Sequence, residues 1–91
     1  MLKRLPRRVY LGKGYYVAVM LASKTALREA VEDEDADIYG AFMPVYGWPK
    51  FGDIYILKSL PASQKWETYW HELVHAVNDL MAWDRDHPLQ T

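Results

Sequence analysis

The spacing of apolar and polar residues predicts a strand and a short helix in the first third of the chain. Residues 15–22 are rich in Val and Tyr and apolar at both alternating positions, which predicts a strand covered on both faces. Ser23 can cap a short helix that ends near residue 31. The acidic run over residues 32–37 then predicts a solvated turn.

The middle of the chain predicts a β-hairpin. Residues 38–46 are typical of one strand, residues 47–52 of a turn, and residues 53–60 of a second strand with Ile54 and Ile56 on one face. Proline cannot donate to the hydrogen bonds between strands. Pro44 therefore indicates that the first of these strands lies at a sheet edge or carries a bulge.

The longest predicted helix covers residues 64 to about 83, after Pro61 and Ser63. Its apolar residues recur at helical spacing, so we expect one stripe of them to face the core. That stripe contains Trp66, Trp70, Leu73, Val77, Leu80 and Met81. At about 100° per residue, Thr68, His71 and His75 lie together on another side of the helix.

Within this helix, residues 71–75 read His-Glu-Leu-Val-His, the HExxH motif. Two histidines four residues apart on a helix can hold one zinc ion, and Glu72 beside them can accept a proton from a bound water. The ordinary alternative is that His71 and His75 are only polar positions on an amphipathic helix.

Length and composition narrow the choice of metal site. The 91 residues suit a single domain, in which a bound metal contributes appreciably to stability. Because the chain has no cysteine, His, Asp, Glu or water must hold the metal, as in a hydrolytic site rather than a zinc finger.

The charge is unevenly distributed. Residues 1–28 carry seven Lys or Arg and no acid, whereas the remainder carries four basic and twelve acidic residues. Such an uneven charge distribution is compatible with an anionic partner such as nucleic acid. We instead favour residues 1–8 as a flexible, solvated start, because no aromatic and basic motif accompanies Arg4, Arg7 and Arg8. No apolar run approaches the roughly 20 residues of a membrane span, so we expect a soluble, cytoplasmic chain.

The order helix, two strands and HExxH helix resembles that of small single-domain zinc metallopeptidases, the SprT-like and ImmA/IrrE-like groups and related short phage-encoded proteins. The resemblance spans roughly residues 36–79. It is carried by Gly40-Ala41-Phe42, Asp53-Ile54-Tyr55-Ile56, Leu60-Pro61, Glu67-Thr68 and the motif with Ala76. It implies an α+β zincin-like domain, with a short antiparallel or mixed sheet packed on a C-terminal HExxH helix. It also implies that residues 53–58 pair with an extended peptide.

The third zinc ligand is less clear from the sequence. His87, in the tail of residues 84–91, resembles the later third histidine of SprT-like proteins, although Pro88 replaces the glycine usual there. Asp84 and Asp86 are alternatives, and a two-histidine site is another. Asp79 can serve as a hydrogen-bond partner of His75.

Two functions follow from these expectations. The first is a zinc-dependent metallopeptidase in which His71, His75 and His87 hold Zn²⁺ and Glu72 is the general base, acting on a peptide or protein substrate. Tyr55 and Tyr69 are candidates to stabilise the oxyanion of that reaction. The second is a noncatalytic metal-binding or phage-encoded interaction protein that keeps the zincin fold.

Overall fold

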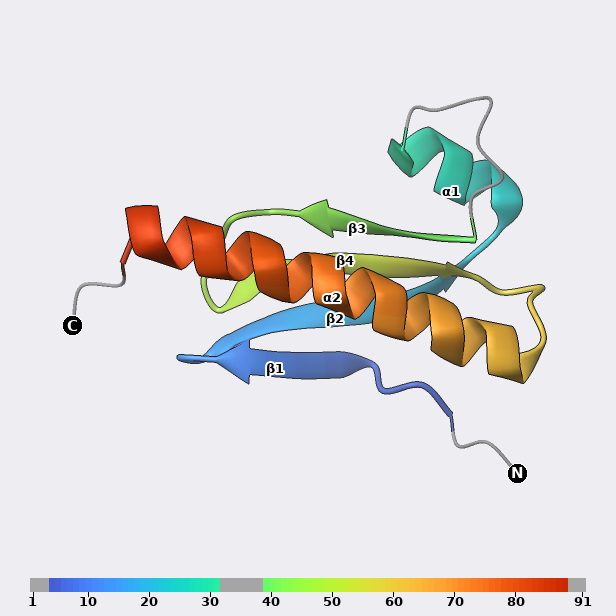
Figure 1. Cartoon of the computed structure of the whole chain (residues 1–91). Coiled ribbons are helices and arrows are strands. Elements are labelled where there is room, and N and C mark those ends of the chain that lie inside the picture. Colours follow the sequence, from blue (N-terminus) through green and yellow to red (C-terminus); the bar gives the residue numbers. More distant parts are fainter. Residues whose placement is uncertain (1–3, 32–38, 89–91) are drawn as a thin grey trace.

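A four-stranded mixed sheet and a long C-terminal helix form two layers (Figure 1). The computed structural model describes residues 4–31 and 39–88. The strand order is β1-β2-β4-β3, with β2 and β4 parallel and the outer pairs antiparallel. In chain order the elements are β1 (Arg8–Gly12), β2 (Tyr15–Ala22), α1 (Lys24–Val31), β3 (Gly40–Pro44), β4 (Lys50–Leu57) and α2 (Ala62–Asp86). The expected α+β class and mixed sheet are confirmed.

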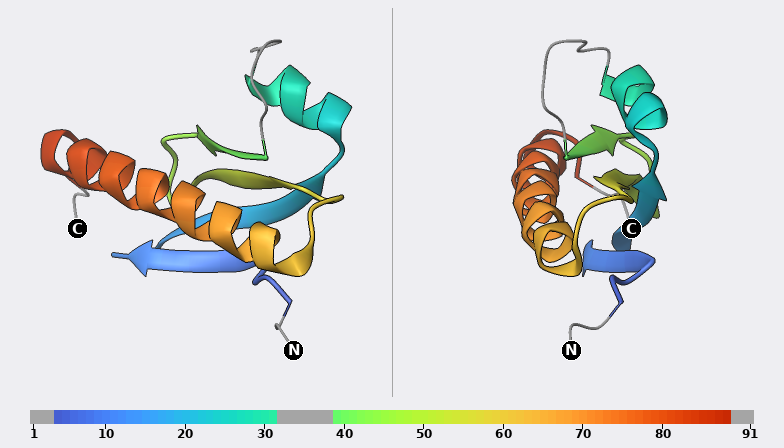
Figure 2. Two further views of the ribbon diagram at one scale, coloured as in Figure 1. Left: turned by 45° about the vertical axis from the view of Figure 1, so that its right-hand side comes forward. Right: turned by 90° about the vertical axis from the view of Figure 1, so that its right-hand side faces the viewer.

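Strand β2 has the predicted bounds, but only one of its faces packs into the core, and only as far as Val19. Tyr15, Val17 and Val19 alternate into the core and are at most 8% exposed. Met20, on the opposite face, is 37% exposed. Figure 2 shows the reason: α2 runs along one face of the sheet, whereas α1 lies at one end, beside β3. The expectation of a strand covered on both faces was wrong.

Helix α1 begins as predicted. The backbone N–H of Ala26 donates to Ser23 Oγ at 3.2 Å, which satisfies one of the free donors of the first turn. Leu27 buries its side chain almost completely, at 1% exposure, and so fixes the helix against the core. The acidic run of residues 32–37 lies outside the described residues.

The predicted hairpin is present as β3 and β4. Ile54 and Ile56 are fully buried on one face, as expected, and β3 is an edge strand, which explains why Pro44 is tolerated there. Strand β4 begins at Lys50, three residues earlier than predicted. An irregularity in its pairing with β2 places Lys50 and Asp53 on the same face, where their side chains form a 2.7 Å ion pair.

Strand β1 was not predicted, although its sequence alternates. Val9 and Leu11 pack against the core, while Arg8 and Tyr10 point to the other face. Leu5, within the stretch expected to be a flexible start, also packs against the core. The basic N-terminal segment thereby becomes part of the sheet from Arg8 onward.

Helix α2 is longer than predicted and is turned differently about its axis. It continues to Asp86, and its buried residues are Tyr69, Glu72, Ala76 and Leu80. Trp70 and Met81, expected in the core, are 57% and 67% exposed, so that part of the prediction was wrong. Apolar residues occupy more than half of the circumference of α2, and their spacing alone does not decide which of them face the sheet. No helix within residues 4–31 and 39–88 has the length and apolar character of a membrane span.

A close contact at Gly40 selects this orientation of α2. A Cβ on Gly40 would collide with Thr68 Cγ2 and would lie 2.9 Å from the carbonyl oxygen of Tyr55 and 3.5 Å from Glu72 Cγ. The absence of a side chain therefore allows the turn of α2 that contains Thr68 and Glu72 to lie directly on β3.

We expect Gly40→Ala to lower the free energy of unfolding by about 1–3 kcal/mol, the usual cost of overpacking a close contact. Urea denaturation followed by circular dichroism measures this loss. Adding Thr68→Ser, which removes Cγ2, should recover part of it, because the contact with the Tyr55 carbonyl remains. An unchanged denaturation midpoint in Gly40→Ala would show that the helix does not depend on this contact.

Candidate metal centre

The two histidines of the motif converge on the exposed side of α2. Their Nε2 atoms lie 3.2 Å apart, and the ring centroids are 4.7 Å apart with the planes at 83°. Both side chains are exposed, so the space beyond the two nitrogens is open to solvent. The helical spacing of four residues thus brings His71 and His75 together, as predicted.

This separation fits two ligands of one zinc ion. Tetrahedral zinc with Zn–N bonds of about 2.0–2.1 Å holds neighbouring nitrogens about 3.3 Å apart. The 3.2 Å between the Nε2 atoms matches that spacing without movement of the helix. The chemistry of the donors fits as well, because neutral imidazole is a common zinc ligand.

Glu72 lies next to the pair, turned toward the sheet. It is 8% exposed and is the only charged residue that is buried in the described part of the chain. Together with His75 it lines a hollow of about 440 Å³, whose other walls are Phe42 and Pro44 of β3 and Asn78 and Asp79 of α2. A carboxylate and an imidazole therefore face one space between the helix and an edge strand.

Tyr46 contacts Asp79, one of the residues that line this space, and was not singled out from the sequence. Its hydroxyl donates to Asp79 Oδ2 at 3.3 Å, and burial together with the charge of Asp79 raises the pKa of the phenol. Its backbone has a φ of 58°, an uncommon conformation for a non-glycine residue. The ring is held by contacts with Trp83 and Phe51, at 4.7 and 5.6 Å between centroids. Asp79 thus accepts from Tyr46, whereas we had expected it to pair with His75.

The other predicted site residues lie elsewhere. His87 ends α2, with its ring stacked on Trp83 at 3.8 Å and its Nδ1 3.3 Å from the Trp83 carbonyl oxygen. His87 lies twelve positions after His75 along the continuous helix, which corresponds to a rise of about 18 Å. Asp84 forms an ion pair with Lys13, and Asp86 with Arg85. Residues 84–86, expected to belong to the tail, are the last residues of α2.

The structure does not bring a third ligand to the pair. Within residues 4–31 and 39–88, no three His, Cys, Asp or Glu side chains cluster in a way that could hold a metal ion. Tyr69 is buried in the core, where desolvation raises its pKa, and Tyr55 lies on the face of the sheet opposite α2. Neither tyrosine borders the 440 Å³ hollow, and Tyr46 is the tyrosine next to it.

A larger hollow, of about 580 Å³, lies away from the motif. Its walls come from residues 4–7, the end of β2 and the first turns of α2, including Lys65 and Trp66. It contains none of the residues of HExxH. Size alone therefore does not identify the functional site in this chain.

A comparison of the chain with models of known families, with curated proteins and with solved structures finds no match. The structure defines a two-layer α+β protein with an HExxH helix on a mixed sheet. Its function must be argued from the site itself.

The position of His87 generates a test of the third ligand. If α2 stays helical to Asp86, His87→Ala should leave the zinc affinity unchanged in calorimetric titration, because the side chain is about 18 Å along the axis from His75. Zinc binding at least about tenfold weaker would show that the last turns unwind and that His87 reaches the metal.

Proposed function

We propose that this chain is a zincin-like zinc metallopeptidase, with His71 and His75 as metal ligands and Glu72 as the general base. The observation that carries the proposal is the 3.2 Å between the two Nε2 atoms, the spacing of two ligands on one tetrahedral ion. A zinc ion bound there would polarise the carbonyl of a substrate and lower the pKa of a bound water toward about 7.

The side chains around the pair suit hydrolysis. Glu72 follows His71 directly and shares the hollow with His75, so its carboxylate can accept a proton from a water held beside the imidazoles and return it to the leaving amine. The hydroxyl of Tyr46 is protonated at neutral pH, and on release from Asp79 it could donate its one hydrogen bond to the developing oxyanion.

The free edge of β3 suits an extended peptide. The hydrogen bonds between β3 and β4 show which residues of β3 bond to β4. Leu57 N–H donates to the Tyr39 carbonyl, and Val45 N–H donates to the Phe51 carbonyl, so every second residue of β3 bonds to β4. The backbone groups of Gly40 and Phe42 therefore point away from β4. A substrate strand added there would pass the hollow that contains Glu72 and His75.

This assignment corrects the strand that we expected to bind peptide. Residues 53–58 belong mostly to β4, which is paired with β2 on one side and β3 on the other. Because both of its edges are occupied, β4 cannot accept another strand. The edge strand β3 takes that role in the proposal.

One observation favours a second candidate, a noncatalytic metal-binding or interaction protein that keeps the fold. Only two ligands converge among the described residues, whereas catalytic zinc commonly has three protein ligands and a water. Such a protein would bind metal at His71 and His75 without hydrolysing peptides. Activity measurements on the metal-loaded chain separate the two candidates.

We expect the chain to bind one equivalent of zinc, and His71→Ala or His75→Ala to abolish that binding, because each removes half of the converging pair. Elemental analysis of protein purified without added metal gives the stoichiometry. His87→Ala is the matched control, a histidine at the C-terminal end of the same helix that does not contact the pair. Equal zinc content in both motif variants would rule out this centre.

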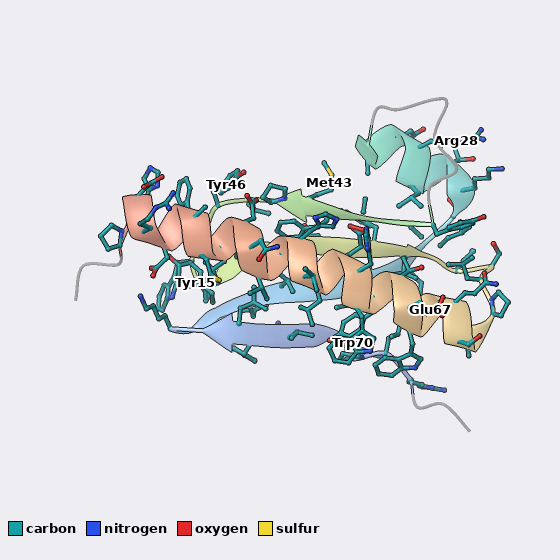
Figure 3. The ribbon with its side chains drawn as sticks, viewed as in Figure 1. Tyr15, Arg28, Met43, Tyr46, Glu67 and Trp70 are labelled. Atoms are coloured by element: carbon teal, nitrogen blue, oxygen red, sulfur yellow. The ribbon has the colours of Figure 1, made fainter. Side chains whose placement is uncertain are left out.

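Glu72→Gln should retain zinc and the fold but lose at least about a hundredfold in peptide hydrolysis, the lower range for removing a general base. Cleavage of a fluorogenic peptide library by the metal-loaded protein measures the loss. Glu67→Gln, an exposed carboxylate on the same helix (Figure 3), should keep full activity. Hydrolysis by Glu72→Gln at the rate of the unsubstituted chain would contradict the assigned base. A zinc-loaded chain that cleaves no peptide would instead favour the noncatalytic candidate.

A further inference from the structure

The face of the sheet opposite α2 collects aromatic and basic residues from three strands. The register pairs Arg8 with Ala18, Tyr10 with Tyr16, and Tyr16 with Lys50, so all five side chains point to the same face. In the described structure this part of the face is uncovered, because α2 lies on the other side and α1 contacts β3 and β4 (Figure 2).

The side chains of Arg8 and Tyr16 stack on each other. The guanidinium of Arg8 lies 4.2 Å from the centroid of the Tyr16 ring, a cation–π contact, and it also forms a hydrogen bond with the Tyr10 side chain. Tyr10 lies beside it, 5.6 Å from Tyr16 between ring centroids, and is 64% exposed. An exposed aromatic ring beside a stacked guanidinium is a surface on which flat, anionic molecules bind.

The charge of this surface is positive. Asp53 is the only acidic residue in the four strands, and its carboxylate is paired with Lys50 at 2.7 Å. Arg8 therefore carries a charge without an acidic partner in the sheet, whereas Arg4 and Arg7 line the hollow on the α2 side. The positive charge of this face thus favours an anionic ligand over an acidic or neutral protein segment.

We propose that this face binds single-stranded nucleic acid, with Tyr10 stacking on a base and Arg8 contacting the phosphates. A single strand suits the surface because its bases are free to stack, whereas those of a duplex are not. Binding through stacking and phosphate contacts makes no use of base edges, so it is tolerant of sequence.

The proposal is independent of the metal centre. Arg8 and Tyr10 lie on the opposite side of the sheet from α2, which carries His71 and His75. Removal of zinc by a chelator should leave nucleic-acid binding unchanged. Loss of peptidase activity and loss of nucleic-acid binding are therefore separable results.

The experiment measures fluorescence anisotropy of labelled oligo(dT) and oligo(rU) of about 15 nucleotides, with a blunt duplex of equal length for comparison. We expect dissociation constants of about 1–100 µM at low salt, with single strands bound more tightly than the duplex. Between about 50 and 200 mM salt, the single phosphate contact of Arg8 predicts a slope of log affinity against log salt of about −0.7.

Tyr10→Ala should weaken binding at least about fivefold, which is the lower end of the range for losing one stacked base. Tyr10→Phe should retain the affinity, because it keeps the ring. Arg8→Gln should weaken binding and make the salt slope shallower by about 0.7. Trp70→Ala and Arg85→Gln are controls on α2, an exposed ring and an exposed guanidinium that should leave the affinity unchanged. Both Tyr10 and Arg8 are exposed, and circular dichroism verifies that the variants fold.

Three results would overturn the proposal. The first is the absence of binding to either single strand up to about 100 µM, the weak limit for nonspecific sites, which would leave the face to a protein partner. The second is binding that Tyr10→Ala and Arg8→Gln leave intact or that the α2 controls weaken equally. The third is duplex binding as tight as that of single strands.

Discussion

The contact of α2 with β3 at Gly40 determines which side chains the helix presents. Because no Cβ stands between them, Thr68 and Glu72 lie against the strand, one helical turn apart. His75 then lines the hollow beside β3, with His71 next to it. Trp70 is turned to the other side of α2, toward β1 (Figure 3). A rotation of this one helix by a single residue position would place an imidazole where the carboxylate lies and would disperse the candidate centre.

The parts of the fold that follow from local pattern were predictable from the sequence. Strand β2 is apolar at every position, and Ser23 caps the next helix. Both elements therefore have the bounds that their patterns predict. Strand β1 alternates, but its basic residues indicated a solvated segment instead. Pairing with β2 gives Val9 and Leu11 a core to pack against, and this tertiary contact is not visible in a stretch of five residues.

The rotation of α2 about its axis and the residue at which it ends were not predictable for a related reason. Large residues such as Trp70 have a stronger apolar signal than Ala76, yet the close approach to the sheet requires the small side chain, which is fully buried. At the C-terminus, Trp83 packs between Tyr46 and His87, and Lys13 pairs with Asp84. These contacts with distant segments keep the last turns helical, although Asp has a low intrinsic preference for helices.

The spacing of HExxH within one helix made the histidine pair predictable, whereas the second surface depends on the register of three strands. Tyr10, Tyr16 and Lys50 are up to 40 positions apart in the chain, and only the pairing of β1 with β2 and of β2 with β4 brings them to one face. The sheet then separates two chemistries. Imidazoles, a carboxylate and the free edge of β3 lie on the side of α2, and the stacked guanidinium and tyrosines lie on the other side near the β1 edge. A peptide strand along β3 and a nucleic-acid strand over β1 and β2 would approach opposite edges of the sheet, so neither ligand would sterically exclude the other. Under the two proposals, one thin domain would present a protein-directed site and an anion-directed surface at the same time.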